Sequence, residues 1–290
     1  MQNVVFTAHD HKYRVDGKEY ISATTLIDRY RQEFDSDFWS MYKGIEQWFR
    51  DEFGDSKGNE RFVEVRRARS FKSPGWFEWV RSLYNVEQGV FEEYQANKLM
   101  EWKLDNDESK RKGSEYHDLK EKEAYEIGHA VNPFTKTKHP TAQKKGKHKK
   151  SIRKLKYGYY PELILWNDEY KVIGTADRVF IGGRWSNQVW IDDYKTNKEI
   201  KKSNMYQKMK TPLGKLDDCN YNHYRLQIGL YAWMLEEQGY EIKGISINHL
   251  GNHMKMRYNT IRPYIKNMLM HYKKGGDNPY GFYEWNVNHT

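Results

Sequence analysis

Hydrophobic residues gather in short runs in the second half of the chain, and their β-branched and aromatic side chains are typical of β-strands. Three such runs follow one another: PELILW, YKVIGTADRVFI and QVWIDDYKT. Turn-forming residues separate them at positions 167–169 and 182–183. Because these connections are short, we predict that the three strands form an antiparallel meander.

Apolar residues recur at helical spacing on both sides of these strands. One helix is predicted at about 222–238, where Gly239 is placed to end it. The segment GISINHL then predicts another strand, and TIRPYIKNMLMHYKK predicts a terminal helix. A long helical region precedes the strands at about 86–127, with an interruption expected near 111–113. Strands enclosed by helices in this order predict an α/β fold, with a central sheet flanked by helices.

The first part of the chain follows a different pattern. KYRV and KEY, joined by Asp16-Gly17, predict a β-hairpin, and Ser22 can cap a helix that begins at ATTLIDRY. Residues 35–84 are rich in aromatic and charged residues and predict short helices. Breaks between these helices are expected at Gly54, Gly58 and Ser73-Pro74-Gly75. We therefore predict an N-terminal hairpin and helical extension at 1–85 and a core domain at 86–290.

Composition excludes several classes of protein. The 290 residues are 16% aromatic, and chains that stay disordered are poor in aromatic residues. No apolar run approaches the roughly 18 residues of a membrane span, and the N-terminus lacks the apolar core of a signal peptide. Cys219 is the single cysteine, which excludes an intramolecular disulfide, a thiolate zinc site and a four-cysteine iron–sulfur cluster. A reducing cytoplasm is therefore the expected compartment.

Positive charge is concentrated in one segment. The formal net charge is +9, but residues 129–156 contain ten lysines and arginines and no acidic residue. Without them, 39 basic residues face 40 acidic ones. Prolines, a glycine and the lack of an apolar period predict that the first half of this segment is a loop, within a basic insertion at about 129–157.

The basic insertion has two interpretations: a solvated flexible loop, or an arm that binds phosphate, because clustered cations displace counterions from a polyanion. Charge alone does not separate nucleic acid from an anionic membrane or an acidic protein. No amphipathic helix with a large apolar face accompanies the insertion, which argues against a membrane. The candidate phosphate contacts are Lys144, Lys145, Lys147, Lys149, Lys150 and Arg153.

The three predicted strands also carry the candidate chemistry. Asp193 and Lys195 are two residues apart, so their side chains share one face of the third strand, and Asp192 points to the other. Asp177 lies on the second strand and Glu162 at the start of the first. A meander would let the three carboxylates converge at one end of the sheet, where they repel one another unless a cation neutralises them.

A magnesium ion suits such a site, because it binds few carboxylates together with water and phosphate oxygens. It can activate water and neutralise charge on a phosphodiester that is being cleaved. Lys195 would position the attacking water, help to deprotonate it, or stabilise the charged transition state. Alternatively, an Asp-x-Lys pair alone is most often a surface salt bridge, and Asp177 alone is often a turn cap. The combination in this order is much rarer.

Five ordered motifs resemble the RecB-like branch of the PD-(D/E)XK nuclease superfamily. They are GSEYH at 113–117, PELIL at 161–165, GTAD at 174–177, DYKT at 193–196 and QIGLY at 227–231. The resemblance covers a little under half of the chain. More weakly, the hairpin followed by ISATTLI resembles phage-type and mitochondrial-maintenance-type members of that branch.

This resemblance implies a restriction-endonuclease-like core and a role for each matched residue. Asp177, Asp193 and the backbone carbonyl of Tyr194 would bind Mg²⁺ or Mn²⁺. His117 would be a further ligand, and Glu162 would contact the metal or water. Lys195 would be the catalytic lysine. Gln227 and Tyr231 share a helix face at their i,i+4 spacing and would steady the lysine and contact DNA phosphate; Tyr231 could instead be a core residue and His117 a surface residue.

The resemblance also has departures. Cys219 alone cannot build the iron–sulfur cluster of some relatives, and no GxxxxGK[ST] phosphate loop is present for a nucleotide cofactor or a fused helicase motor. We therefore expect a stand-alone metal-dependent DNA nuclease, an exonuclease more than an endonuclease, acting in the host cytoplasm if it is phage-encoded. The basic insertion would be an arm over the active site.

Two other functions share parts of this pattern. One is a restriction-type or junction-cutting endonuclease, which would use the same core chemistry. The other is a non-catalytic nucleic-acid-binding protein on a nuclease fold. Tryptophans of the extension could stack on single-stranded bases, but we favour a core role for them in a helical cap. These tryptophans are Trp39, Trp48, Trp76 and Trp79.

Overall fold

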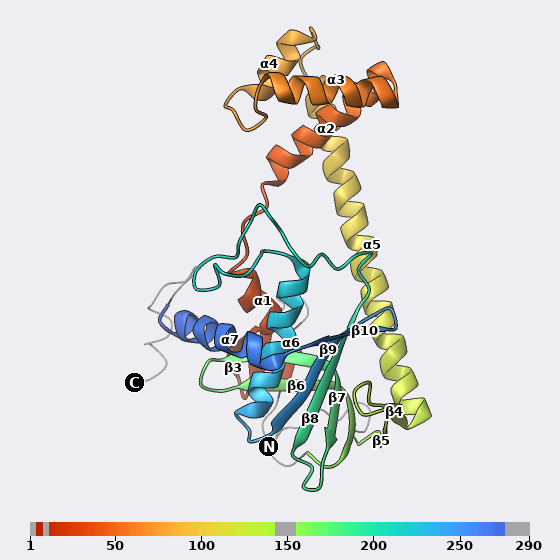
Figure 1. The fold of residues 1–290 in the computed structure, drawn as a ribbon, viewed down its shortest axis with the longest axis vertical. Coiled ribbons are helices and arrows are strands. Elements are labelled where there is room, and N and C mark those ends of the chain that lie inside the picture. The colour runs from red at the N-terminus through yellow and green to blue at the C-terminus, as the bar shows by residue number, and fades with distance from the viewer. Residues whose placement is uncertain (1–3, 8–11, 143–154, 276–290) are drawn as a thin grey trace. The chain divides into compact units, whose positions relative to one another are not determined.

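The computed structural model describes residues 4–7, 12–142 and 155–275. Within these residues the chain forms a mixed α/β structure, in which helices flank a central sheet of eight strands (Figure 1). A separate two-stranded sheet lies close to it in sequence. None of the helices in the described ranges has the length and apolar character needed to cross a bilayer.

The elements follow one another along the chain with these bounds. The strands are β1 (Val4–Thr7), β2 (Lys12–Val15), β3 (Lys18–Ser22), β4 (His129–Val131), β5 (Lys138–Pro140), β6 (Gly158–Asn167), β7 (Val172–Gly182), β8 (Gln188–Lys195), β9 (Glu241–His249) and β10 (Asn252–Met256). The helices are α1 (Ala23–Asp28), α2 (Ser36–Phe53), α3 (Asp55–Ala68), α4 (Trp76–Leu83), α5 (Val90–Ile127), α6 (Asn220–Glu236) and α7 (Tyr258–Lys273).

Strand β7 is the centre of the sheet. The strand order is β1-β2-β3-β7-β8-β9-β10, and β6 pairs with β7 along its other edge. The pairs β6–β7 and β7–β8 are both antiparallel, so the predicted meander is confirmed. The pairs β3–β7 and β8–β9 are parallel, which makes the sheet mixed.

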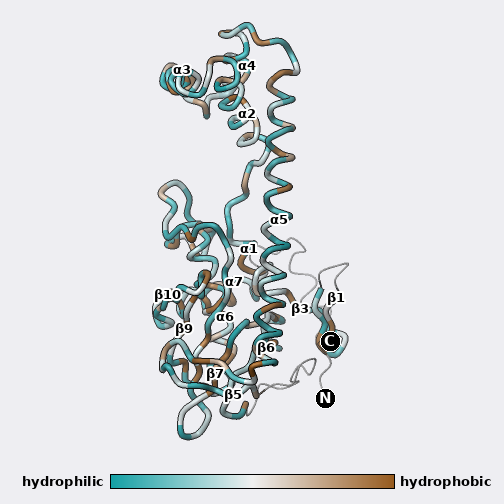
Figure 2. Tube along the Cα trace, turned by 90° about the vertical axis from the view of Figure 1, so that its right-hand side faces the viewer, coloured by the Kyte–Doolittle hydropathy of each residue, from teal (hydrophilic) through white to brown (hydrophobic). Residues whose placement is uncertain are grey.

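Helices cover both faces of this sheet. Alternate residues of β8 point to opposite faces and therefore enter different hydrophobic clusters. Val189 and Ile191 belong to the main core, together with residues of α6 and α7. Trp190 points to the other face, where it packs in a cluster with Ala124 of α5. Hydrophobic stretches accordingly follow the sheet and α6 (Figure 2).

The chain divides into two compact units, and their limits differ from the predicted boundary at 85. One unit combines the described residues up to 32 with those from 112 onward, and the other is residues 33–111. The hairpin β2–β3 belongs to the first unit, because Ile21 and Ser22 pair with the start of β7. The sequence shows no sign of this long-range pairing, since it joins segments about 150 residues apart in the printed numbering.

The second unit contains α2, α3, α4 and the first part of α5, and it has a hydrophobic cluster of its own. Trp48 and Trp76 are 7% and 1% exposed within it, and Trp39 and Trp79 pack against its edge. The core interpretation of these tryptophans is therefore confirmed. A break was expected at Gly58, but this residue lies inside α3. Its role is in packing: a Cβ there would come within 2.3 Å of the Phe49 carbonyl oxygen, so only glycine allows this close approach.

Local signals gave most element ends correctly. Asp16 and Gly17 both have positive φ, as the predicted hairpin turn requires, and the Ser22 hydroxyl accepts a hydrogen bond from the Thr25 amide at the start of α1. The expected interruption near 111–113 is wrong, because α5 continues through it. The first half of the basic insertion is also not a simple loop: β4 and β5 pair there, around a turn capped by the buried Asn132 side chain.

Candidate metal-binding active site

One edge of β7 is incompletely paired, and the candidate site lies there. On that edge β3 pairs with Val172 and Ile173, and β8 pairs with residues 178–182. Between these two pairings, residues 174–177, the sequence GTAD, have no strand partner on that edge within the part of the chain that the structure describes. At the end of this gap, the Asp177 carboxylate accepts a hydrogen bond from the Tyr194 amide through Oδ2, at 2.7 Å. Asp177 therefore holds β8 where the ladder stops, and its Oδ1 remains directed elsewhere.

Glu162 lies opposite Asp177 on β6, within the register that pairs Pro161 with Arg178 and Leu163 with Ala176. Its φ is +47°, a left-handed conformation that is strained for a non-glycine residue in a strand. Directly opposite residues of antiparallel strands project on the same side of the sheet, unless the strand is locally distorted. The strained residue is thus the one whose carboxylate lies near the Asp177 carboxylate.

His117 of α5 reaches both of these acids. Its Nδ1 lies 3.4 Å from Asp177 Oδ1 and 3.6 Å from Glu162 Oε1. Ligand atoms of these three residues all lie within 4.8 Å of one another, an arrangement that could hold a metal ion. Burial lowers the pKa of His117, but hydrogen bonds to the two carboxylates raise it more, to about 10. Without a metal, the His117 imidazolium therefore offsets part of the negative charge of Asp177 and Glu162.

Asp193 and Lys195 form a second ionic pair beside this cluster. Both extend from one face of β8, as predicted, and the Lys195 ammonium contacts Asp193 Oδ2. Asp193 is fully buried, and Lys195 has 14% of its side chain exposed. Since Arg178 pairs with Asp192 in the ladder, Asp177 and Asp193 occupy the next position of the same two strands.

Asp193 interacts electrostatically with this cluster, whose converging ligand atoms belong to His117, Glu162 and Asp177. Burial and the nearby Asp177 carboxylate raise the pKa of Asp193 to about 7, although Lys195 and His117 oppose this. Burial lowers the pKa of Lys195, but Asp193 and Asp177 raise it more, so its net pKa is above the usual value and the side chain is an ammonium. The site thus contains three carboxylates and two cations, most of them shielded from water.

Tyr194 and Asp192 face away from these carboxylates. The Tyr194 amide donates to Asp177, and its ring packs edge-on against His117 at 5.9 Å between centroids. No contact tests whether its carbonyl binds a metal, so that role stays a prediction. Asp192 lies on the opposite face, as predicted, where Arg178 donates to it at 2.6 Å. The Ser246 hydroxyl donates to Asp192, and the ring of the partly exposed His253 also contacts it.

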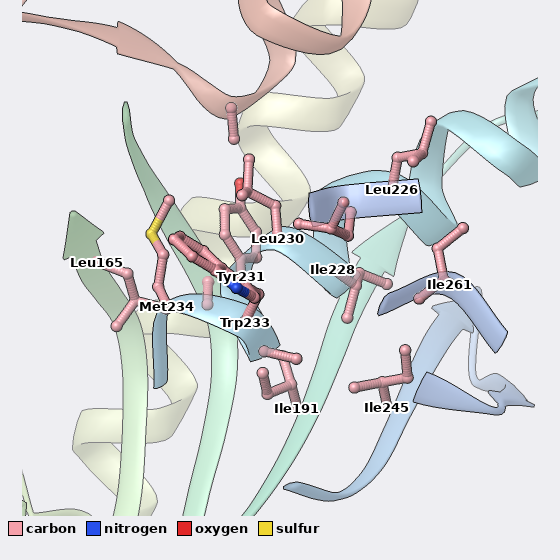
Figure 3. Close-up of a cluster of buried hydrophobic side chains, with 14 of the residues drawn as sticks. Leu165, Ile191, Leu226, Ile228, Leu230, Tyr231, Trp233, Met234, Ile245 and Ile261 are labelled. Atoms are coloured by element: carbon pink, nitrogen blue, oxygen red, sulfur yellow. The ribbon is translucent and has the colours of Figure 1, made fainter. Parts of the chain in front are cut away.

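Gln227 and Tyr231 of α6 lie behind the site. The Gln227 amide donates to the Tyr231 hydroxyl at 3.0 Å. Tyr231 is only 2% exposed and lies among the aliphatic core side chains between α6 and the strands (Figure 3). Burial in this core raises the pKa of its hydroxyl, with Asp193 as the next cause. Its burial agrees with the interpretation of Tyr231 as a core residue, and the predicted contacts of both residues with Lys195 and with phosphate stay predictions.

Two residues of the site had no sequence-based assignment. Gly174 leaves the space that the Tyr231 ring fills, since a Cβ at Gly174 would lie 2.5 Å from Tyr231 Cε1. The ring of Tyr224, one helical turn before Gln227, lies under the Lys195 ammonium. The three-residue spacing between Tyr224 and Gln227, which puts both on one helix face, is the sequence signal that could have placed Tyr224 at the site. The candidate phosphate contacts of the basic insertion lie outside the described residues: Lys144, Lys145, Lys147, Lys149, Lys150 and Arg153.

The donor set fits a hard divalent cation. Carboxylate oxygens and one imidazole converge, and no thiolate takes part in the cluster. Among the described residues, neither oxygen of the buried Asp193 has a well-directed hydrogen-bond donor, even though the Lys195 ammonium is close to one of them. Buried carboxylate oxygens normally have such partners, so the unpartnered Oδ1 is free to accept a metal ion.

Comparisons with protein families, with curated proteins and with solved structures found no match for this chain.

Proposed function

We propose that the chain is a Mg²⁺- or Mn²⁺-dependent DNA nuclease of the RecB-like PD-(D/E)XK type, an exonuclease more than an endonuclease. The observation that supports this most strongly is the arrangement of Glu162, Asp177 and Asp193 on three consecutive strands. Lys195 lies against the last of these carboxylates, and His117 lies against the first two. The mixed sheet with helices on both faces is compatible with a restriction-endonuclease-like core.

In this proposal each side chain has a separate task. Asp177 and Asp193 bind the metal, and Glu162 and His117 complete its surroundings. A bound Mg²⁺ would polarise the phosphodiester and lower the pKa of a coordinated water. Lys195, which carries a proton, orients the attacking water and stabilises negative charge that develops on the phosphate. Tyr231 and Gln227 hold the interior side of the site, and the basic insertion supplies a DNA-binding arm.

The proposal is tested by incubating end-labelled linear DNA with the full chain in Mg²⁺, in Mn²⁺ and in EDTA. We expect cleavage that requires the metal and releases small products from DNA ends. Glu169→Gln, at an exposed acid on the β6–β7 turn, should cleave at the wild-type rate, whereas Asp177→Asn should not cleave. Equal cleavage in EDTA and Mg²⁺, or full activity of Asp177→Asn, would contradict the proposal.

A non-catalytic DNA-binding protein is less compatible with the site. A buried group of three carboxylates and a lysine is costly to maintain, and a protein that only binds DNA has no use for it. The same assay decides between exonuclease and endonuclease: covalently closed circular DNA and end-blocked linear DNA should resist an exonuclease. Cleavage of the circle would favour the restriction-type or junction-cutting alternative.

Metal affinity should depend on pH, because protons and metal compete for the same groups. Asp193 holds a proton up to about pH 7, and His117 to about pH 10. Both pKa values are above those of the unfolded chain, so the metal-free protein loses folding stability as pH rises through these values. A bound metal offsets this loss. From pH 7 to pH 5, a pKa of about 7 means that Asp193 alone should weaken the apparent metal affinity roughly fiftyfold.

The measurement is the rise in melting temperature on adding Mg²⁺ at pH 5.5 and pH 8. The rise should be much larger at pH 8, and Asp193→Asn should abolish it. Glu169→Gln, whose exposed carboxylate pairs with Lys273, should retain the full effect. A rise of equal size at both pH values would show that the metal does not bind at Asp193 and His117.

A further inference from the structure

One face of α6 presents three polar aromatic or amide side chains toward the site. Tyr224, Gln227 and Tyr231 are three and four residues apart, so they lie along one stripe of the helix. A hydrogen bond joins the Gln227 amide to the Tyr231 hydroxyl. Tyr224 lies at the end of the stripe next to Lys195, whose Nζ is 4.8 Å from the centroid of the tyrosine ring.

The Tyr224 ring is held in place on its other side. Its hydroxyl donates to the side-chain oxygen of Asn197, which is two residues after Lys195. His249 at the end of β9 in turn contacts the Asn197 carbonyl oxygen at 2.6 Å. The loop that follows β8 is thereby joined to both α6 and β9, and the ring cannot turn away from Lys195 without breaking the contact with Asn197.

We propose that Tyr224 is a positioning residue that holds the Lys195 ammonium against Asp193. The face of an aromatic ring carries negative charge density and attracts an ammonium, more strongly where water is excluded. Lys195 is mostly shielded, so the ring and the Asp193 carboxylate define one position for a side chain with four rotatable bonds. The catalytic consequence rests on the proposed nuclease function; the positioning itself does not.

Tyr221 offers a matched control on the same helix. It is partly buried against the same core as Tyr224, and a cation also lies over its ring, since Arg225 is 5.5 Å from the centroid. That cation is outside the site. Replacing either tyrosine removes a similar amount of packing, but replacement of Tyr224 alone releases Lys195.

The experiment measures Lys195 directly by its rate of modification with an amine-specific reagent, read by peptide mass spectrometry on the full chain without metal. Tyr224→Leu and Tyr224→Met should increase that rate roughly tenfold, the size expected for a shielded cation–ring contact. Tyr224→Phe keeps the ring but loses the contact with Asn197, so its rate should stay much closer to wild type than that of Tyr224→Leu. Tyr221→Leu should behave like wild type. Equal Lys195 modification in wild type, Tyr224→Leu and Tyr224→Met would overturn the proposal.

Cleavage kinetics provide the second readout. In Tyr224→Leu, kcat should fall roughly tenfold while KM for DNA stays unchanged, and Tyr224→Phe should restore kcat. Two outcomes would show a merely structural role. One is a loss of activity that Tyr224→Phe does not restore, and the other is a loss that parallels the fall in melting temperature in both Tyr224→Leu and Tyr221→Leu. If Lys195 becomes more reactive as expected but the wild-type chain cleaves no DNA, the positioning stands and the nuclease proposal fails.

Discussion

Replacing Lys195 by alanine is expected to lower the rate of DNA cleavage by a factor of about 10³, the usual effect of removing one preorganised charge-stabilising donor. The structure gives the reason, because the Lys195 ammonium is held between Asp193 and the Tyr224 ring. Its raised pKa keeps it charged in the neutral range. DNA affinity should change little, since Lys195 is mostly shielded and contributes little to the exposed positive surface.

Cleavage rates and DNA binding must be measured separately to test this expectation. Binding is followed by fluorescence anisotropy of a labelled oligonucleotide in EDTA, where a metal-dependent enzyme does not cleave. Lys243→Ala is the control, because that lysine is exposed and paired with Glu241 at the start of β9. A Lys195→Ala variant that cleaves at the wild-type rate would remove Lys195 from the mechanism, and parallel loss of binding would make it a DNA contact.

Folding stability gives an additional, pH-dependent signature of the same substitution. Without Lys195, the buried Asp193 loses its closest positive charge, so its pKa should rise further. At pH 6 the carboxyl group would be neutral and the stability cost small. At pH 8 it would be ionised, or would hold its proton at a cost, and Lys195→Ala should then be less stable relative to wild type.

The strands of the meander were predictable from the sequence because each signal is local. Short runs rich in β-branched and aromatic residues identify β6, β7 and β8, and the short turns between them favour adjacent antiparallel pairing. The pairing of β3 with β7 was not predictable, because a strand of five residues gives no sign of its distant partner. For the same reason the boundary of the helical unit differs from the prediction.

The candidate site could be predicted in part for a similar physical reason. Alternation places Asp193 and Lys195 on one face, and the meander brings Asp177 and Glu162 beside them. The sequence could not show that the ladder is open at residues 174–177, nor that Glu162 adopts a positive φ. The open ladder depends on how β3 and β8 share one edge of β7, which no local signal reveals. His117 entered only through the family resemblance, because its distance from the strands depends on how α5 packs.

Gly174→Ala is the second substitution for which we expect a large effect. Its added Cβ would lie 2.5 Å from Tyr231 Cε1 and 3.0 Å from the Tyr231 hydroxyl oxygen, which is closer than packed atoms allow. Tyr231 is enclosed by the core, so either its ring or β7 must move. Overpacking of this kind costs about 1–3 kcal/mol of folding free energy. The displacement would also break the Gln227–Tyr231 hydrogen bond behind the carboxylates, and we expect cleavage to fall further than stability alone explains.

A second glycine of the predicted motifs separates this effect from a general consequence of glycine replacement. Gly113 lies inside α5, and a Cβ there would meet only Thr196 Oγ1, at an ordinary 3.6 Å. Because alanine favours a helix over glycine by about 1 kcal/mol, Gly113→Ala should be as stable as wild type or more stable. Chemical denaturation measures the change in folding free energy of both variants. Tyr231→Phe/Gly174→Ala should stay destabilised, because phenylalanine keeps the Cε1 atom that is closest to the added Cβ. Equal stability of Gly174→Ala and wild type would mean that Tyr231 has room to shift, and that its position does not depend on the gap left by Gly174.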